Sequence, residues 1–188
     1  LERHDIILQS ELTVLCPMTE GDWESLLRWN NDPEVLYFAE GDEVIERSAD
    51  EVRNLYRSVC RNAFCFMIVF KGQPIGECWL QKMNLERIIK VHPGMDCRRI
   101  DLMIGEKDFW GQGIGTHAIE LLTKFGFEEE GADVIFGCDV ADYNPRSIKA
   151  FQRVGFEVCN EVRQTQGSKA ESCYDVILTR EKYMQEGI

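Results

Sequence analysis

Three glycines within five positions stand where an amphipathic helix must begin, and this arrangement suits the binding of a phosphate group. They are Gly111, Gly113 and Gly115. The first turn of a helix exposes unpaired backbone N–H groups at the positive end of the helix dipole, and glycines let a bulky anion approach those groups. A tight strand-to-helix turn without a ligand would use the same residues. Neither the GxGxxG pattern nor the P-loop, which needs a lysine after the glycines, fits the spacing. The glycines therefore predict an anion site or a structural turn.

The segments around the glycines alternate between strand and helix patterns. Helical spacing and capping residues predict helices over residues 19–32, 48–60, 114–131 and 145–154. Apolar runs bounded by turn residues predict strands over residues 11–16, 63–70, 75–83, 98–105, 132–140, 157–165 and 171–180. Thr19 or Glu20 is the expected start of the first helix, Ser48 has the spacing of a capping box, and Asn144 is the expected cap of the last helix. Gly72 and Pro74 indicate a hairpin.

The cysteines and histidines lack the spacing of a metal site. The chain has eight cysteines but no CxxC pair, and His4, His92 and His117 stand far apart, so the zinc templates do not fit. Several cysteines lie inside apolar runs that resemble strands. We therefore expect reduced thiols in the core, and neither a metal nor a disulfide framework.

The length and charge limit the class of protein. The chain has 188 residues, which suits one domain over residues 1–188, acting as a monomer or a homodimer. Its formal net charge of −12 disfavours nucleic acid and anionic membranes as partners and favours cationic small molecules. No apolar run reaches the roughly 20 residues needed to span a bilayer, and the first residues lack the features of a signal peptide. A cytoplasmic protein is expected.

The order of these segments, together with "GQGIGT" at residues 111–116 and "NxxSxxxFxxxGF" at residues 144–156, resembles the GNAT superfamily of acyl-CoA-dependent N-acetyltransferases. The resemblance implies an α/β (α+β) fold with a mixed, mostly antiparallel sheet, a central splayed pair of parallel strands and flanking helices. It also implies acetyl-CoA as acetyl donor. By the same resemblance, the residues that bind acetyl-CoA are Leu102, Met103, Ile104, Gln112, Gly113, Ile114, Gly115, Thr116, Asn144 and Ser147. Trp110 holds a place where the family usually has Gln or Arg.

Within this superfamily the segment "HPGMDCRRIDLMIGE" is similar to aminoglycoside 6'-N-acetyltransferases. The resemblance implies that Asp101 and Asp139 bind ammonium groups of the acceptor. Either aspartate could instead be a strand-end residue paired with a surface base. Acetyl transfer needs a neutral amine, and an amine with a pKa of about 10 is mostly protonated at neutral pH. Asp101 is therefore the expected base, directly or through water, and the N–H of Met103 is the expected donor to the oxyanion.

Phe151 stands where many members of the superfamily have a tyrosine that protonates the leaving thiolate. This phenylalanine cannot act as an acid. Because a thiol has a pKa of about 8.5, the thiolate is a tolerable leaving group without one.

The segment of residues 29–44 combines aromatic and acidic side chains. Trp29, Tyr37 and Glu40 are candidates for stacking on the acceptor and attracting its charge. Alternatively, the aromatic residues lie in the core and the acidic residues form a solvated loop. These observations favour acetyl transfer to a primary amine of an aminoglycoside-like substrate. Acetylation of a ribosomal-protein or peptide N-terminus and a CoA-binding module without catalysis are the alternatives.

Overall fold

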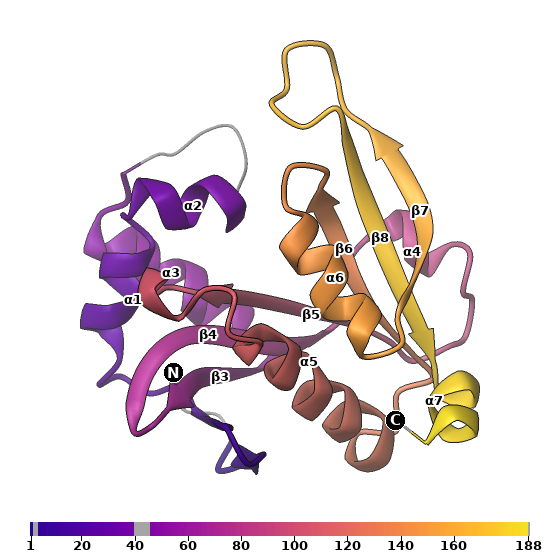
Figure 1. The fold of residues 1–188 in the computed structure, drawn as a ribbon, viewed down its shortest axis with the longest axis horizontal. Coiled ribbons are helices and arrows are strands. Elements are labelled where there is room, and N and C mark those ends of the chain that lie inside the picture. Colours follow the sequence, from indigo (N-terminus) through magenta and orange to yellow (C-terminus); the bar gives the residue numbers. More distant parts are fainter. Residues whose placement is uncertain (2–3, 40–45, 188) are drawn as a thin grey trace.

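The computed structural model describes residues 1, 4–39 and 46–187. Its central feature is an eight-stranded sheet in the order β1-β2-β3-β4-β5-β6-β8-β7 (Figure 1). The strands are β1 (Leu8–Gln9), β2 (Thr13–Pro17), β3 (Ala63–Phe70), β4 (Gln73–Lys82), β5 (Cys97–Ile104), β6 (Val134–Ala141), β7 (Glu157–Arg163) and β8 (Ser172–Thr179). Neighbouring strands are antiparallel except β5 and β6, which are parallel. The mixed, mostly antiparallel α/β fold expected from the sequence is confirmed.

Helices cover both faces of the sheet. They are α1 (Trp23–Trp29), α2 (Pro33–Ala39), α3 (Ala49–Val59), α4 (Glu86–Ile89), α5 (Ile114–Lys124), α6 (Pro145–Arg153) and α7 (Arg180–Glu186), with short helical turns at Lys107–Phe109 and Phe125–Glu129. Alternate residues of β3 pack into two hydrophobic cores, one on each face of the sheet. Phe66 and Ile68 pack in the core beneath α5 and α6, whereas Cys65 and Met67 pack in the core beneath α1, α2 and α3.

The parallel strands β5 and β6 separate after a short contact. Their pairing ends at Arg99 and Phe136, although both strands continue. Beyond this point the ring of Phe151 from α6 lies so close to Gly137 of β6 that a Cβ on this glycine would collide with it. The separation leaves the edge of β5 from residue 100 to residue 104 unpaired on its β6 side. This is the splayed pair that the resemblance implied.

Local sequence signals account for several element boundaries. Ser48 forms the predicted capping box with Glu51, and the side chain of Asn144 accepts the Ser147 N–H at the start of α6. The β3–β4 hairpin and the closing pair β7–β8 are also confirmed. Helix α1 begins at Trp23, later than predicted, because the carboxylate of Asp22 accepts the Thr19 N–H and hydroxyl and forms a turn ahead of it.

Three short helices were not predicted. Helix α2 lies in the aromatic and acidic segment, where the carboxylate of Asp32 accepts the N–H groups of Glu34 and Val35. Helix α4 lies between β4 and β5, and α7 follows β8. Glu40 lies outside the described residues. Within the described part of the chain, no helix has the length and apolar character required to cross a membrane.

Candidate active site

The glycine turn opens onto a pocket of about 300 Å³, here called the glycine-turn pocket. Gly113 is the N-cap of α5 and has a φ of 82°, which favours glycine. No described side chain caps this helix, and its first turn carries no acidic residue. A Cβ on Gly111 or Gly113 would meet no atom within 4 Å. The backbone N–H groups of Ile114, Gly115 and Thr116 are therefore donors at the wall of an open pocket, as an anion requires.

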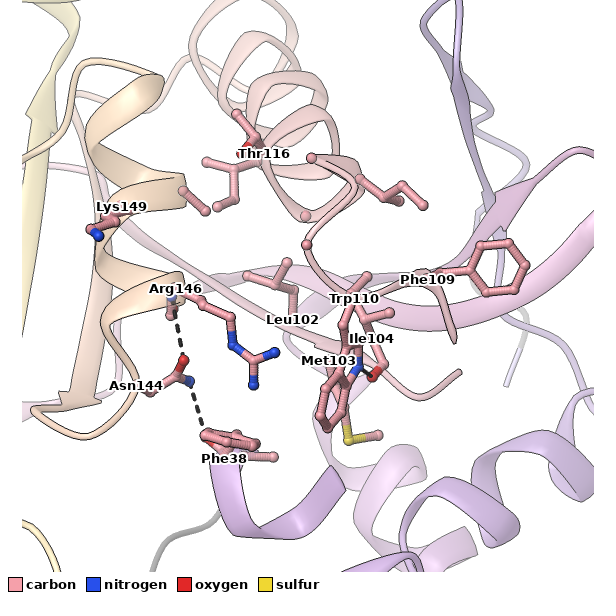
Figure 2. A pocket seen from close by; sticks show the side chains of 18 of the residues that line it. Phe38, Leu102, Met103, Ile104, Phe109, Trp110, Thr116, Asn144, Arg146 and Lys149 are labelled. Carbon is pink, nitrogen blue, oxygen red and sulfur yellow. Dashed lines mark hydrogen bonds between the residues drawn. The ribbon is translucent and has the colours of Figure 1, made fainter. Parts of the chain in front are cut away.

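Three basic side chains of α6 line the same pocket, and the sequence analysis missed them. They are Arg153 and, labelled in Figure 2, Arg146 and Lys149. No acidic residue is among the described residues that line this pocket. The signal was present, because positions three and four apart lie on one face of a helix. In a chain with a net charge of −12, this local positive charge reinforces the anion site formed by α5.

The backbone of β5 directs its polar groups alternately to β4 and to the splayed opening. A Cβ on Gly76 of β4 would collide with the carbonyl oxygen of Met103, which therefore points to β4. In an antiparallel pair the N–H and C=O of one residue face the same strand. The groups of Leu102 and Ile104 consequently face the opening, where the indole Nε1 of Trp110 donates to the Ile104 carbonyl at 2.8 Å. This geometry argues against the predicted oxyanion role of the Met103 amide.

An aromatic and cationic cluster joins α2, the glycine turn and α6 at this pocket. The Arg146 guanidinium lies 4.5 Å from the ring centroid of Phe38 and 4.7 Å from that of Trp110 (Figure 2). Asn144 donates to the Phe38 carbonyl at 3.3 Å while capping α6, so it also holds α2 against the site. Asn144 therefore makes two contacts, one that caps α6 and one that holds the end of α2.

A second pocket of about 570 Å³, here called the acidic pocket, adjoins the first. The two share the lining residues Phe38, Ala39, Leu102, Met103, Asn144 and Ser147. The acidic residues Glu77, Asp101 and Asp139 are among those that line the acidic pocket, and no Lys, Arg or His is among its described lining residues. One pocket is therefore lined by basic residues and its neighbour by acidic residues. One suits phosphates and the other suits ammonium groups.

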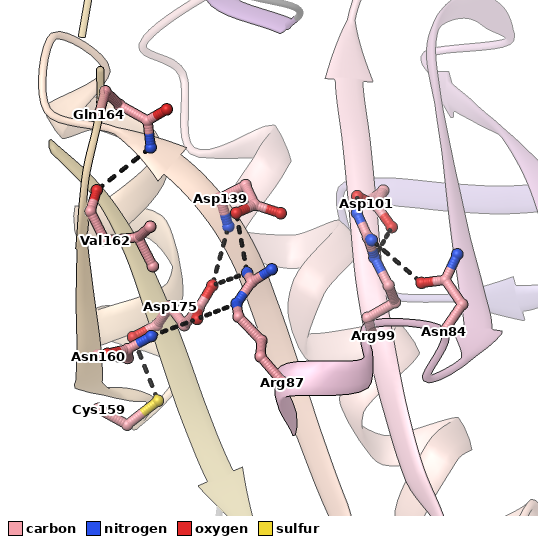
Figure 3. A network of polar contacts seen from close by, with 10 residues as sticks. All are labelled: Asn84, Arg87, Arg99, Asp101, Asp139, Cys159, Asn160, Val162, Gln164 and Asp175. Atoms are coloured by element: carbon pink, nitrogen blue, oxygen red, sulfur yellow. Dashed lines mark hydrogen bonds and ion pairs between the residues drawn. The ribbon is translucent and has the colours of Figure 1, made fainter. Parts of the chain in front are cut away.

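Asp101 is held firmly at the acidic pocket. Its carboxylate accepts a hydrogen bond from Trp79 Nε1 at 3.0 Å. It also pairs with both Nε and Nη2 of Arg99 (Figure 3). Arg99 is oriented in turn by the Asn84 side chain at 3.3 Å. The aspartate side chain remains 22 % exposed. Asp101 is therefore positioned by its partners but still accessible from the pocket.

Glu77 is a buried carboxyl group that the sequence analysis did not single out. Only 3 % of this residue is exposed. The Tyr56 hydroxyl donates to Oε1 at 3.3 Å and itself accepts from Asn30 Nδ2 at 2.8 Å, but Oε2 has no hydrogen-bond partner among the described residues. Burial, and then the nearby charge of Asp101, raise the pKa of Glu77 well above its ordinary value. No local pattern marks this residue, because its burial comes from the packing of α3 on the sheet.

Replacing Glu77 by glutamine should stabilise the protein more as the pH rises. The pKa of Glu77 lies well above 4.5 in the folded protein, so the unfolded chain loses this proton at a lower pH than the folded protein. Wherever the folded state holds more protons, the free energy of unfolding falls as the pH increases. Glutamine does not titrate. The difference in Tm, Glu77→Gln minus wild type, should therefore grow between about pH 5 and about pH 8, and a constant difference in thermal unfolding would contradict the raised pKa.

Asp139 lies at the opposite side of the acidic pocket from Asp101, in a network with α4 and β8. It has a φ of 55° at the point where the β6–β8 register shifts, and Arg87 pairs with its carboxylate at 2.8 Å (Figure 3). Arg87 also pairs with the carboxylate of the buried Asp175 at 2.9 Å. The same carboxylate accepts the backbone N–H of Asp139 at 3.1 Å. The structure therefore agrees with the alternative in which Asp139 pairs with a basic side chain of the protein. Ammonium binding by Asp139 remains a prediction.

The remaining predicted residues divide between the pockets and their surroundings. All the predicted acetyl-CoA contacts line the glycine-turn pocket except Gln112, which is exposed and donates to the Asp108 carbonyl at 2.9 Å. Trp29 is buried in the core, where its Nε1 bonds Glu106 at 2.9 Å, and it lines neither pocket. Tyr37 is 42 % exposed and also lines neither. For Trp29, the alternative in which the aromatic residues of segment 29–44 lie in the core is therefore the one that the structure has.

Metal ligands do not gather at either pocket or elsewhere in residues 1, 4–39 and 46–187. No group of three His, Cys, Asp or Glu side chains in these ranges is placed to hold an ion. The eight cysteines are thiols rather than disulfides, and four of them are buried.

Comparisons with known proteins agree with this geometry. Residues 13–157 match the family described as "Acetyltransferase (GNAT) domain". Among solved structures, an aminoglycoside acetyltransferase, AAC(6')-Ib, in complex with coenzyme A and kanamycin is similar, with a TM-score of 0.74 at 20 % identity over 94 % of this chain and 99 % of that one. A spermidine N-acetyltransferase from Vibrio cholerae in complex with CoA and spermine has a TM-score of 0.75 at 17 % identity, over 93 % and 99 % of the two chains. A GNAT acetyltransferase from Bacillus anthracis has a TM-score of 0.73 at 17 % identity, over 94 % and 99 %. Since the family match spans most of the sequence, the chain belongs to the GNAT family of acetyltransferases, enzymes that take their acetyl group from acetyl-CoA.

Proposed function

We propose that this enzyme transfers the acetyl group of acetyl-CoA to a primary amine of a cationic acceptor of the aminoglycoside or polyamine type. The observation that carries the proposal is the contrast between two adjoining pockets, one lined by the N-terminus of α5 and basic residues and the other by acidic residues. Two proteins of similar fold were crystallised with kanamycin and with spermine, which are both polycationic amines.

On the donor side, the diphosphate of acetyl-CoA binds the N–H groups of Ile114, Gly115 and Thr116. Lys149 and Arg153 add positive charge beside it. The pantetheine arm then runs along the unpaired edge of β5, away from the helix. Asn144 and Ser147, which line both pockets, stand between the donor and the acceptor.

The direction of the backbone N–H groups of β5 indicates which of them can donate to the oxyanion. Leu102 and Ile104 face the opening, and Leu102 is the farther of the two from the glycine turn. Because the thioester is at the far end of the pantetheine arm from the diphosphate, its carbonyl oxygen lies at the Leu102 amide. This residue replaces Met103 as the proposed donor to the oxyanion.

On the acceptor side, Asp101 binds the reacting ammonium and accepts its proton, directly or through water. The neutral amine then attacks the thioester carbon, the C–S bond breaks and the thiolate leaves, while the nitrogen gives its second proton to water so that a neutral amide results. Phe151 is buried against Phe156, with ring centroids 5.1 Å apart, and offers no proton. The thiolate of CoA, whose thiol has a pKa of about 8.5, takes its proton from water after it leaves.

The proposal is tested by the release of free thiol from acetyl-CoA in the presence of kanamycin, spermine or a basic peptide. We expect thiol release with kanamycin or spermine, together with an acetylated amine identified by mass spectrometry. Omitting the amine provides the control for hydrolysis. Turnover of the peptide alone would contradict the proposed acceptor class, and thiol release without an acetylated product would contradict amine transfer.

A further inference from the structure

We propose that Glu77 is a second ammonium-binding residue of the acidic pocket, so that the acceptor carries at least two amino groups. This inference rests on the function proposed above. The carboxyl oxygen Oε2 of Glu77 is the atom that contacts the ammonium group. That oxygen is buried, lies in a residue that lines the pocket, and has no hydrogen-bond partner among the described residues.

The sheet register places Glu77 near the predicted base. Glu77 of β4 pairs with Met103 of β5, and Trp79 pairs with Asp101. Alternate residues of a strand point to one face, so the side chains of Glu77 and Asp101 share a face of the sheet. They form a diagonal pair, for which a Cβ–Cβ separation of roughly 7 Å is usual. One acceptor molecule with two amino groups can therefore contact both carboxyl groups.

The contacts of Glu77 fix one oxygen and leave the other for a ligand. Tyr56 donates to Oε1, and Asn30 Nδ2 donates both to the Tyr56 hydroxyl and to the Leu26 carbonyl, so the direction of this chain of hydrogen bonds is set. Asp175 provides the contrast. It is equally buried, but Arg87, Asn160 and the Asp139 N–H all donate to its oxygens, and it lines neither pocket. Asp175 has the contacts of a structural carboxylate, whereas Glu77 does not.

The charged and titratable groups around Glu77 explain why it needs a cation from the acceptor. They are Asp101 from β5, Tyr56 from α3, Cys60 at the end of α3, Cys65 from β3 and Cys78 of β4 itself. None of them is a cation. With the pocket empty the buried carboxyl keeps its proton, and when an ammonium binds at Oε2 this proton leaves to solvent and the carboxylate pairs with the ammonium.

The positions of the two carboxyl groups indicate which amino group of the acceptor binds at each of them. Asp101 lies on β5, the strand whose free edge receives the thioester, and Glu77 lies on β4, one strand farther from the opening. The reacting amino group therefore binds at Asp101. The second amino group binds at Glu77 and contributes to affinity and selectivity without entering the reaction.

Steady-state kinetics of Glu77→Gln with spermine and with butylamine, which has one amino group, test this assignment. Loss of a hydrogen bond to a charged group should raise KM for spermine roughly ten- to a hundredfold. The kcat for spermine should stay within about twofold, because contact with a non-reacting amino group stabilises the ground state and the transition state equally. The kcat/KM for butylamine should be unchanged.

The matched control is Glu128→Gln. Glu128 also accepts a tyrosine hydroxyl, that of Tyr183 at 2.7 Å, but lines neither pocket. Its KM for spermine should equal that of the wild type. Calorimetry in two buffers of different ionisation enthalpy adds a second measurement, in which spermine binding to the CoA-bound wild type should release one more proton than binding to Glu77→Gln.

The outcomes separate this inference from the proposed function. Equal KM values and equal proton release for wild type and Glu77→Gln would overturn the role of Glu77 while acetyl transfer stands. An equal loss of activity on spermine and butylamine would assign Glu77 a structural role and would also overturn it. If the wild type acetylates none of the amines tested, the proposed function itself fails, and the inference fails with it.

Discussion

Gly115→Asp should weaken acetyl-CoA binding by more than about a hundredfold while leaving the fold at least as stable as that of the wild type. Gly115 is the second residue of α5, and a Cβ there would meet only Leu102 Cδ1, at 3.4 Å. An acidic residue in the first turn of a helix stabilises it by about 0.3–1 kcal/mol, and replacing glycine within a helix adds to this. The same carboxylate would lie in the glycine-turn pocket, where it repels the diphosphate.

Calorimetric titration with CoA measures the effect, and we expect the Kd to rise more than about a hundredfold, equivalent to roughly 2.7 kcal/mol. Thermal unfolding should show an equal or higher Tm. Gly115→Asn is the matched control, because asparagine has nearly the same size as aspartate but no charge, and its loss of affinity should be smaller. Wild-type affinity in Gly115→Asp would place the anion site elsewhere.

Asp101→Asn should lower kcat for amine acetylation by about two to four orders of magnitude, the usual contribution of a general base. The carboxylate lines the acidic pocket and not the glycine-turn pocket, so the Kd for CoA should stay at the wild-type value. Thiol release with spermine gives kcat, and calorimetry gives the Kd. Because the change leaves Arg99 with a weaker partner, the Tm should be measured alongside.

Asp139→Asn removes the same charge from the same pocket and is the control for electrostatics. Its carboxylate already pairs with Arg87, so we expect kcat to be preserved and KM to change by less than about fivefold. If Asp101→Asn retained more than a tenth of the wild-type kcat, or if both variants lost activity equally, Asp101 would not be the base.

The parts of the site that the sequence could predict are those with local signals. The glycine turn, the capping box at Ser48 and the Asn144 cap depend on residues a few positions apart, and the structure has all three. The basic face of α6 had a local signal too, in the spacing of Arg146, Lys149 and Arg153. Helix α2 had one as well, because its first residue is the proline of an Asp-Pro pair.

Other parts depend on contacts between distant segments. Arg87 and Asp139 are 52 positions apart, and nothing in either segment shows that they pair. The direction of the Met103 amide follows from the β4–β5 register, which side-chain patterns do not determine at the level of single N–H groups. The burial of Glu77 requires α3 to pack Tyr56 over β4. The splay of β5 and β6 came from the resemblance alone.

A crystal structure of the protein with acetyl-CoA is the most direct test of the central claim, that the N-terminus of α5 and the free edge of β5 hold the donor beside the acidic pocket. We predict diphosphate density within hydrogen-bond distance of the N–H groups of Ile114, Gly115 and Thr116, with the thioester carbonyl at the Leu102 N–H. A diphosphate bound away from α5, with these N–H groups bonded to other parts of the protein, would contradict the account.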